Sequence, residues 1–261
     1  MTRSRNNDGA TAGAQSVRRA LAVLRALATG QEQGVRLTDV VSHTGLSRPT
    51  VHRILQVLAE ESAVEQDPVT RRYLIGKELG LLALARSARS SLQAYSEPHL
   101  HKLSQVVGDT VFLTIRNGVD SICIQRHIGS FPIKVLSIEI GARRPLGVGV
   151  SGLVLLSALS DDDAQEVVHC NERRLRALKI KPSELLERAA RTAQLGYAYA
   201  PVGVVPGTRA LAVPVRTQDG TTVAGLAVAT ITDRLPDTRI EVLTRYMQQC
   251  AAHIGNAMKT A

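Results

Sequence analysis

Six polar side chains between residues 47 and 56 are of types that bind a polyanion. The group mixes short hydroxyl side chains with arginine and histidine, and it contains no acidic residue. Hydroxyl groups in the first turn of a helix suit phosphates, and arginine guanidinium groups donate hydrogen bonds to phosphates and to guanine edges. This chemistry indicates contact with nucleic acid. The six residues are Ser47, Arg48, Thr50, His52, Arg53 and Gln56.

Residues 37–53, LTDVVSHTGLSRPTVHR, are expected to position these side chains on two short helices joined by a tight turn. Thr38 is expected to cap the first helix, and Gly45 to end it in a left-handed conformation. Ser47 is expected to cap the second helix, with Pro49 in its first turn. The pattern predicts a helix-turn-helix whose second helix enters a DNA groove, and an ordinary two-helix corner fits these residues equally well. The second helix would pack through Val51, Leu55 and Leu58.

The flanking sequence favours the DNA-binding interpretation. Ser16 is expected to cap a preceding helix, and residues 64–66 and 72–75 are predicted to form two short strands around an Asp67-Pro68 turn. A hairpin directly after a recognition helix is a wing that approaches the DNA; a plain surface hairpin is the alternative. The predicted DNA-contacting residues of this winged helix-turn-helix are Arg18, Arg19, Thr38, Ser47, Arg48, Thr50, His52, Arg53, Arg71 and Arg72.

The distribution of charge supports a polyanionic partner at the N-terminal end. The 261 residues carry a formal net charge of +9. Residues 1–57 contain eight Lys and Arg and three acids, residues 58–90 contain five of each, and residues 91–261 contain 19 and 15. The positive excess is therefore densest around the predicted helix-turn-helix, as binding to double-stranded DNA requires.

Cysteine usage and the N-terminal sequence bear on the compartment. Cys123, Cys170 and Cys250 lie far apart in the sequence, which indicates reduced thiols and no metal site. The polar start MTRSRNNDGATAGAQ does not resemble a signal peptide, and no apolar run approaches the ~18 residues of a membrane helix. We therefore expect a cytoplasmic protein without a membrane association.

Four segments are expected along the chain. They are a frayed tail at residues 1–14, a winged helix-turn-helix at 15–76, a connector helix at 77–90 and a second domain at 91–261. The connector, KELGLLALARSAR, is too rich in leucine and alanine for a flexible linker. Burial against a second copy would explain it, and packing on its own domain is the alternative.

The second domain is predicted to be α+β. Asn117-Gly118 and Asp219-Gly220 mark tight hairpins, which require antiparallel pairing and exclude a doubly wound parallel sheet. The predicted strands are 110–116, 122–127, 133–140, 197–200, 210–215 and 223–231, and the predicted helices are 91–107, 152–159, 183–195 and 240–258.

Several segments, taken in order, resemble the IclR family of bacterial transcription regulators. They are SVRRALAVLRAL, LTDVVSHTGLSRPTVHRIL, RRYLIG, GDTVFLTIRNG, RRPLGVGVSGLVLLSAL, VPGTRALAVPV and VAGLAVATITDRL. The resemblance covers nearly the whole chain from Ser16 and implies a winged helix joined by a connector helix to a GAF-like effector-binding domain. It also implies a homodimer or dimer of dimers on palindromic operators, with the recognition-helix and wing residues named above as contacts. Pro49 departs from the family, which often has a polar residue there.

Residues 147–152, GVGVSG, match the G-x-G-x-x-G pattern of dinucleotide-binding proteins in an unsuitable context. The preceding strand is predicted to end near Ile140 and the following helix is short, so a dinucleotide is not expected. A glycine-rich loop that opens into a helix at Gly152 nevertheless presents N–H groups that suit a carboxylate. The resemblance implies effector contacts at this turn, and late strands are expected to form the opposite wall. The predicted effector-binding residues are Leu146, Gly149, Val150, Ser151, Ala200, Val202, Ala210, Ala227 and Ala229.

The predicted wall is small and apolar, where some members of the family carry an aspartate and polar partners for small keto acids. We therefore hypothesise that the effector is a larger, less polar acid of aromatic type. Simple packing explains the alanines equally well.

Catalysis is not indicated by any residue pattern. Leu153 stands where a nucleophile elbow around Ser151 requires glycine, and His99 and His101 are predicted on a helix, where their spacing separates the rings. We therefore expect no catalytic residue and no cofactor. The sequence predicts a DNA-binding regulator that responds to a small organic effector. The alternative is a metabolite-binding module or an enzyme whose N-terminal domain mediates protein contacts.

Overall fold

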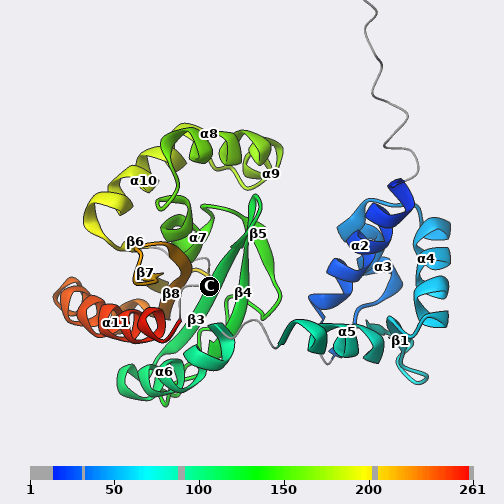
Figure 1. The fold of residues 1–261 in the computed structure, drawn as a ribbon, viewed down its shortest axis with the longest axis horizontal. Helices are drawn as coiled ribbons and strands as arrows, with labels where there is room; N and C mark the ends of the chain where they lie inside the picture. Colours follow the sequence, from blue (N-terminus) through cyan, green and yellow to red (C-terminus); the bar gives the residue numbers. More distant parts are fainter. Residues whose placement is uncertain (1–13, 31–32, 88–91, 202–204, 259–261) are drawn as a thin grey trace, which may run out of the picture. The chain divides into compact units, whose positions relative to one another are not determined.

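The computed structural model describes residues 14–30, 33–87, 92–201 and 205–258 (Figure 1). Contacts divide the chain into two compact units, Met1–Arg89 and Ser90–Ala261, and each unit is considered by itself. Three predicted features lie outside the described residues: residues 1–13 of the tail, residues 88–90 of the connector, and Val202.

The N-terminal unit packs three helices around one small core and adds a two-stranded hairpin. Val40, Val51 and Leu55 are fully buried in this core, and Tyr73 of the hairpin joins them. Tyr73 also forms a single β-bridge with Val35, which ties the hairpin to the segment just before the helix at residues 37–44. The elements are α2 (Gln15–Ala28), α3 (Leu37–Thr44), α4 (Arg48–Glu60), β1 (Val64–Gln66), β2 (Tyr73–Ile75) and α5 (Lys77–Ser87).

The turn between α3 and α4 has the predicted local chemistry. Gly45 ends α3 with φ of 67°, and the Ser47 hydroxyl accepts the Thr50 N–H at 3.4 Å at the start of α4. Pro49 lies in the first turn of α4, where no intrahelical N–H is needed. The two helices are therefore set by signals that are local in the sequence.

Two other predicted caps are wrong. Thr38 does not cap α3, because Val35 is held by its bridge to Tyr73 and the chain stays extended through Arg36 before the helix begins at Leu37. Ser16 does not cap α2, which begins one residue earlier, at Gln15, after a helical Ala14.

The hairpin is held by its turn. Asp67 accepts hydrogen bonds from the Thr70 N–H at 2.6 Å, the Thr70 hydroxyl at 2.9 Å and the Val69 N–H at 3.0 Å, and these bonds lower the pKa of the Asp67 carboxyl. Arg71 lies in the left-handed region with φ of 58°, so the second strand begins at Tyr73 rather than at the predicted Arg72.

The C-terminal unit is built on one antiparallel sheet with strand order β5-β4-β3-β8-β7-β6. Helices α6 and α11 cover one face of the sheet, and α7 with α8, α9 and α10 covers the other (Figure 1). Both faces are buried, which explains the long apolar runs in the central strands. The elements are α6 (Leu92–Val107), β3 (Thr110–Asn117), β4 (Asp120–His127), β5 (Arg143–Pro145), α7 (Gly149–Leu156), α8 (Asp161–Cys170), α9 (Glu172–Ala177), α10 (Pro182–Leu195), β6 (Ala198–Ala200), β7 (Thr208–Arg216), β8 (Thr222–Ile231) and α11 (Asp237–Ala257), with a short 3-10 turn at Thr232–Arg234.

Residues 133–140 do not form the predicted strand. The short strand β5 takes the place beside β4, and carbonyl groups of the 133–140 segment are bound by side chains instead. Arg144 donates from Nη2 to the Ser137 carbonyl at 2.9 Å, and Arg126 donates from Nη1 to the Ile138 carbonyl at 3.3 Å. The segment therefore satisfies backbone acceptors without a neighbouring strand.

Helix α7 begins at Gly149, three residues before the predicted start. Val148 is extended and Gly149 has φ of 76°, so the chain turns sharply there and the helix follows at once. Within the described parts of the chain, no helix is long and apolar enough to cross a membrane. The same described parts contain no grouping of three or more His, Cys, Asp or Glu side chains suited to a metal ion.

Candidate functional site

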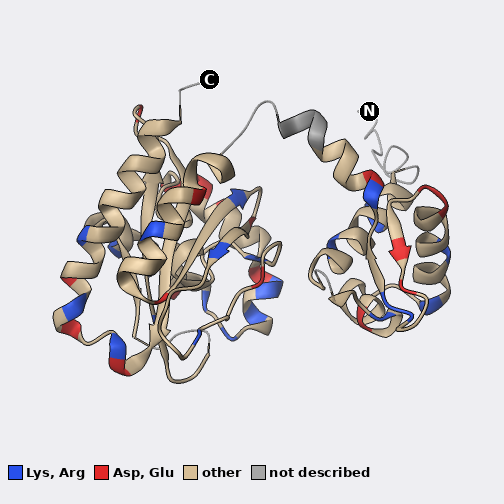
Figure 2. Cartoon of the chain, turned by 90° about the horizontal axis from the view of Figure 1, so that it is seen from below, with Lys and Arg blue, Asp and Glu red and all other residues tan. Residues whose placement is uncertain are grey.

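The exposed face of α4 carries the predicted DNA-binding side chains. Val51 and Leu55 face the core, while Arg48, His52 and Arg53 are exposed. The Ser47 and Thr50 hydroxyls are hydrogen-bonded to each other at 2.8 Å, so they serve first to begin the helix. The exposed side chains of Arg48, His52 and Arg53 are then the best placed for contacts beyond the protein. Figure 2 shows basic and acidic segments interspersed over the ribbon of both units.

The remaining predicted DNA contacts lie on other parts of the same unit. Arg18, Thr38 and Arg71 are exposed, whereas Arg19 is half-buried. Arg72 is also half-buried and donates from Nη1 to the Gly34 carbonyl at 3.2 Å, which fixes the wing to the body of the unit. All of these remain predictions as DNA contacts.

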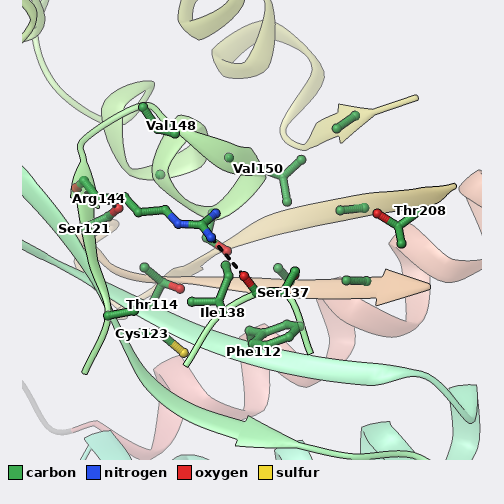
Figure 3. A pocket seen from close by; sticks show the side chains of 18 of the residues that line it. Phe112, Thr114, Ser121, Cys123, Ser137, Ile138, Arg144, Val148, Val150 and Thr208 are labelled. Carbon is green, nitrogen blue, oxygen red and sulfur yellow. Dashed lines mark hydrogen bonds between the residues drawn. The ribbon is translucent and has the colours of Figure 1, made fainter. Parts of the chain in front are cut away.

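A cavity of about 230 Å³ lies between α7 and the sheet in the C-terminal unit (Figure 3). Its floor is made by alanines at paired positions of three strands: Ala200 opposes Ala210, and Ala210 opposes Ala229. Such short side chains leave the space that larger residues would fill. The lining residues are Phe112, Thr114, Ser121, Cys123, Ser137, Ile138, Ala142, Arg144, Val148, Gly149, Val150, Ser151, Gly152, Ile180, Arg188, Ala200, Thr208, Ala210, Ala227 and Ala229.

The first turn of α7 forms one wall of the cavity. Gly149, Val150 and Ser151 lie there, and no side chain caps this helix start. The helix approaches β8 closely, since a Cβ added at Gly225 would lie 2.9 Å from the Ser151 carbonyl oxygen. Glycine at 225 therefore allows the positive end of the helix dipole to border the cavity.

Arg144 enters the cavity from β5 and is its most polar feature (Figure 3). Nη2 is bound to the Ser137 carbonyl, whereas Nη1 is buried without a hydrogen-bond partner. A Cβ added at Gly149 would lie 3.8 Å from Nη1, so the guanidinium lies beside the first turn of α7. Burial lowers the pKa of Arg144, yet arginine remains a cation at neutral pH. The Arg144 guanidinium and the start of α7 together favour the binding of an anion in this cavity.

Most of the predicted effector-binding residues meet in this cavity. Gly149, Val150 and Ser151 lie opposite the four described alanines of the prediction, Ala200, Ala210, Ala227 and Ala229. Leu146 is fully buried in the core and does not line the cavity. Their role in binding an effector remains a prediction.

The sequence interpretation missed the polar end of the cavity. Arg144, Thr114 and Ser121 lie there, and Arg144 precedes the glycine-rich run by only three residues, which was the available signal. Cys123 lies beside them, and burial raises the pKa of its thiol to about 11, so it is protonated and unreactive at neutral pH.

The motifs that suggested other chemistry occur in unsuitable surroundings. The G-x-G-x-x-G run follows a three-residue strand of an antiparallel sheet, not a strand of a parallel βαβ unit. His99 and His101 lie on α6 as predicted, and the His99 ring stacks on His253 with ring centroids 5.6 Å apart.

A helix-turn-helix unit joined to a sheet unit with an internal cavity defines a class of DNA-binding transcription regulators. Residues 16–68 match the IclR helix-turn-helix domain, and residues 86–256 match the C-terminal domain of the bacterial transcriptional regulator IclR. The chain therefore belongs to the IclR family. It is a DNA-binding transcriptional regulator, and its relatives are regulators rather than enzymes.

Relatives align with nearly the whole chain. XynR of Escherichia coli strain K12 is 26% identical over 94% of this chain and 97% of its own length. The glycerol operon regulatory protein of Streptomyces griseus is 29% identical over 92% of this chain and 95% of its own length.

Solved structures share the fold. The IclR transcriptional regulator of Alicyclobacillus acidocaldarius superposes with a TM-score of 0.71 at 23% identity, covering 92% of this chain and 97% of that one. An IclR homolog of Microbacterium hydrocarbonoxydans, complexed with 4-hydroxybenzoate, gives a TM-score of 0.70 at 20% identity, covering 92% and 98%.

Proposed function

We propose that this regulator binds operator DNA through α4 and the wing, and that a small organic acid in the cavity under α7 changes this binding. The observation that carries the effector part is Arg144, whose buried Nη1 faces a cavity without an acidic residue among its described lining. The homolog bound to 4-hydroxybenzoate supports an acid as the type of ligand. In this proposal residues 15–76 bind DNA, residues 77–90 connect, and residues 91–261 bind the effector.

The proposed assembly is a homodimer, or a dimer of dimers, on a palindromic operator in the cytoplasm. Helix α5 exposes Leu81 by 57% and Leu82 by 60%, and a second copy that covers them would explain these apolar side chains. An effector that fits one arrangement of the two copies better than another shifts the population between DNA-binding and non-binding dimers. Sedimentation of a Leu82→Lys variant tests this assembly, since a dimer that persists unchanged would exclude α5 from the interface.

Footprinting on the DNA just upstream of the protein's own gene tests the regulatory function. We expect protection of two half-sites related by a two-fold axis, and loss or shift of protection when an organic acid is added. Binding to promoter DNA and to random DNA with equal affinity at rising salt would contradict operator recognition.

A further inference from the structure

The polar end of the cavity holds two buried side-chain atoms without a hydrogen-bond partner. They are Arg144 Nη1 and Thr114 Oγ1, and they account for two of the four such atoms in the described part of the chain. Thr114 is only 4% exposed. A buried donor without an acceptor is unfavourable, so an acceptor that reaches both atoms gains more than it would at the surface.

The charge at this end calls for one anionic group. Arg144 is half-buried and its Nη1 is fully buried, whereas the other cationic lining residue, Arg188, is exposed on α10. Because none of the described lining residues is acidic, no side chain of the cavity neutralises Arg144. A single carboxylate can accept from the guanidinium, from the Thr114 hydroxyl and from the first turn of α7.

The rest of the cavity is mainly apolar and of limited size, with Ser137, Thr208 and Arg188 as its polar lining residues. Phe112, Ile138 and Val150 stand around the alanine floor, and Figure 3 shows them on the side away from the base of the Arg144 side chain. A cavity of about 150 Å³ lined by apolar side chains accepts a benzene ring. The volume of about 230 Å³ therefore has room for one ring with a carboxylate.

We propose that the effector is a carboxylate on a single aromatic ring, with its carboxylate bound by Arg144 and Thr114 and its ring packed on the alanine floor against Phe112. This inference rests on the proposed function and specifies its ligand. Arg144 and Thr114 determine the specificity for the carboxylate, and the alanines determine the size of the ring.

Isothermal titration calorimetry on the full chain tests the inference with benzoate, its uncharged analogue benzamide, and acetate. We expect benzoate to bind at least tenfold more tightly than either of the others, because each of them lacks one half of the interaction. Arg144→Gln should weaken benzoate binding about 10- to 100-fold, and Thr114→Val should weaken it about 3- to 10-fold.

Arg143→Gln is the matched control. It removes the same charge from the adjacent residue, whose side chain pairs with Asp120 at 3.5 Å and does not line the cavity. It should bind benzoate as the wild type does. Thermal melting of each variant establishes that it is folded, and Arg144→Lys, which restores the charge, should recover part of the affinity.

Several results would overturn the inference. They are equal affinity for benzamide and benzoate, undiminished benzoate binding by folded Arg144→Gln, and terephthalate binding tenfold more tightly than benzoate. If glyoxylate or pyruvate binds and releases operator DNA while benzoate does not, the aromatic class is wrong and the proposed function stands. If no acid binds and none changes the footprint, the aromatic class and the proposed response to an organic acid are both wrong.

Discussion

Replacing Arg53 by alanine should weaken operator binding strongly while leaving the N-terminal unit folded. Successive helical residues advance about 100° around the axis, so Arg53 projects about 180° away from the midpoint between buried Val51 and Leu55. The side chain is exposed and packs into no core, and substitutions at such positions change the free energy of unfolding by less than about 0.5 kcal/mol.

The expected loss follows from the two copies that bind one operator. A bidentate contact to a base edge contributes about 1–3 kcal/mol, so the loss of two contacts amounts to about 2–6 kcal/mol. This corresponds to a rise in Kd of about 30-fold to about 20,000-fold. If Arg53 contacts only phosphate, the slope of log K against log salt should instead fall by about 0.9 per copy.

Fluorescence anisotropy with labelled operator, titrated between about 50 and 200 mM salt, measures both quantities. Arg176→Ala is the control, because it removes the same charge from an exposed position on α9, where Arg176 pairs with Glu172 at 2.7 Å. A contact between Arg53 and the operator is refuted if Arg53→Ala melts like the wild type and binds operator with an unchanged Kd and an unchanged salt slope.

Three further predictions concern stability. Asp109→Ala should lower the free energy of unfolding by about 3 kcal/mol in urea denaturation. The substitution removes the buried carboxylate that pairs with Arg234 and Arg239, whose side chains are each about a quarter exposed. Ser47→Ala should lower it by about 1 kcal/mol in the same measurement, through loss of the hydroxyl that begins α4. Between pH 7 and pH 5, the melting temperature of His99→Phe should fall less than that of the wild type. Burial and the neighbouring His253 lower the pKa of His99, so below about 6.5 the unfolded chain binds the proton first and stability falls with pH; phenylalanine keeps the stacked ring but does not titrate.

Each of these has a contradicting outcome. Unchanged urea midpoints would remove the Asp109 ion pairs or the Ser47 cap from the stabilising interactions. Parallel pH profiles for the wild type and His99→Phe would show that the proton on His99 does not couple to folding.

Local signals made the N-terminal unit and the hairpins predictable. Gly45 and Ser47 fix the corner between α3 and α4 through bonds that span three or four residues. Asn117-Gly118 likewise places Asn117 opposite Asp120 across a two-residue turn. A cap signal before α8 was also present, since the Ser160 hydroxyl accepts the Asp163 N–H at 3.2 Å, although the sequence interpretation did not include this helix.

Features that depend on distant contacts could not be predicted in this way. Thr38 failed as a cap because Val35 pairs with Tyr73, which lies far along the chain. Residues 133–140 alternate like a strand, but bonds from Arg126 and Arg144 bind the segment as a loop. The position of Arg144 in the cavity depends on where β5 joins the sheet, and the local spacing of residues does not indicate this pairing.

The close approach of α7 to Gly225 has a consequence for engineering the regulator as a biosensor. Any side chain at 225 would collide with the Ser151 carbonyl and lift the helix start that borders the cavity. Ala210, Ala227 and Ala229 line the cavity itself. Libraries that retune ligand choice should therefore diversify the alanines and keep glycine at 225.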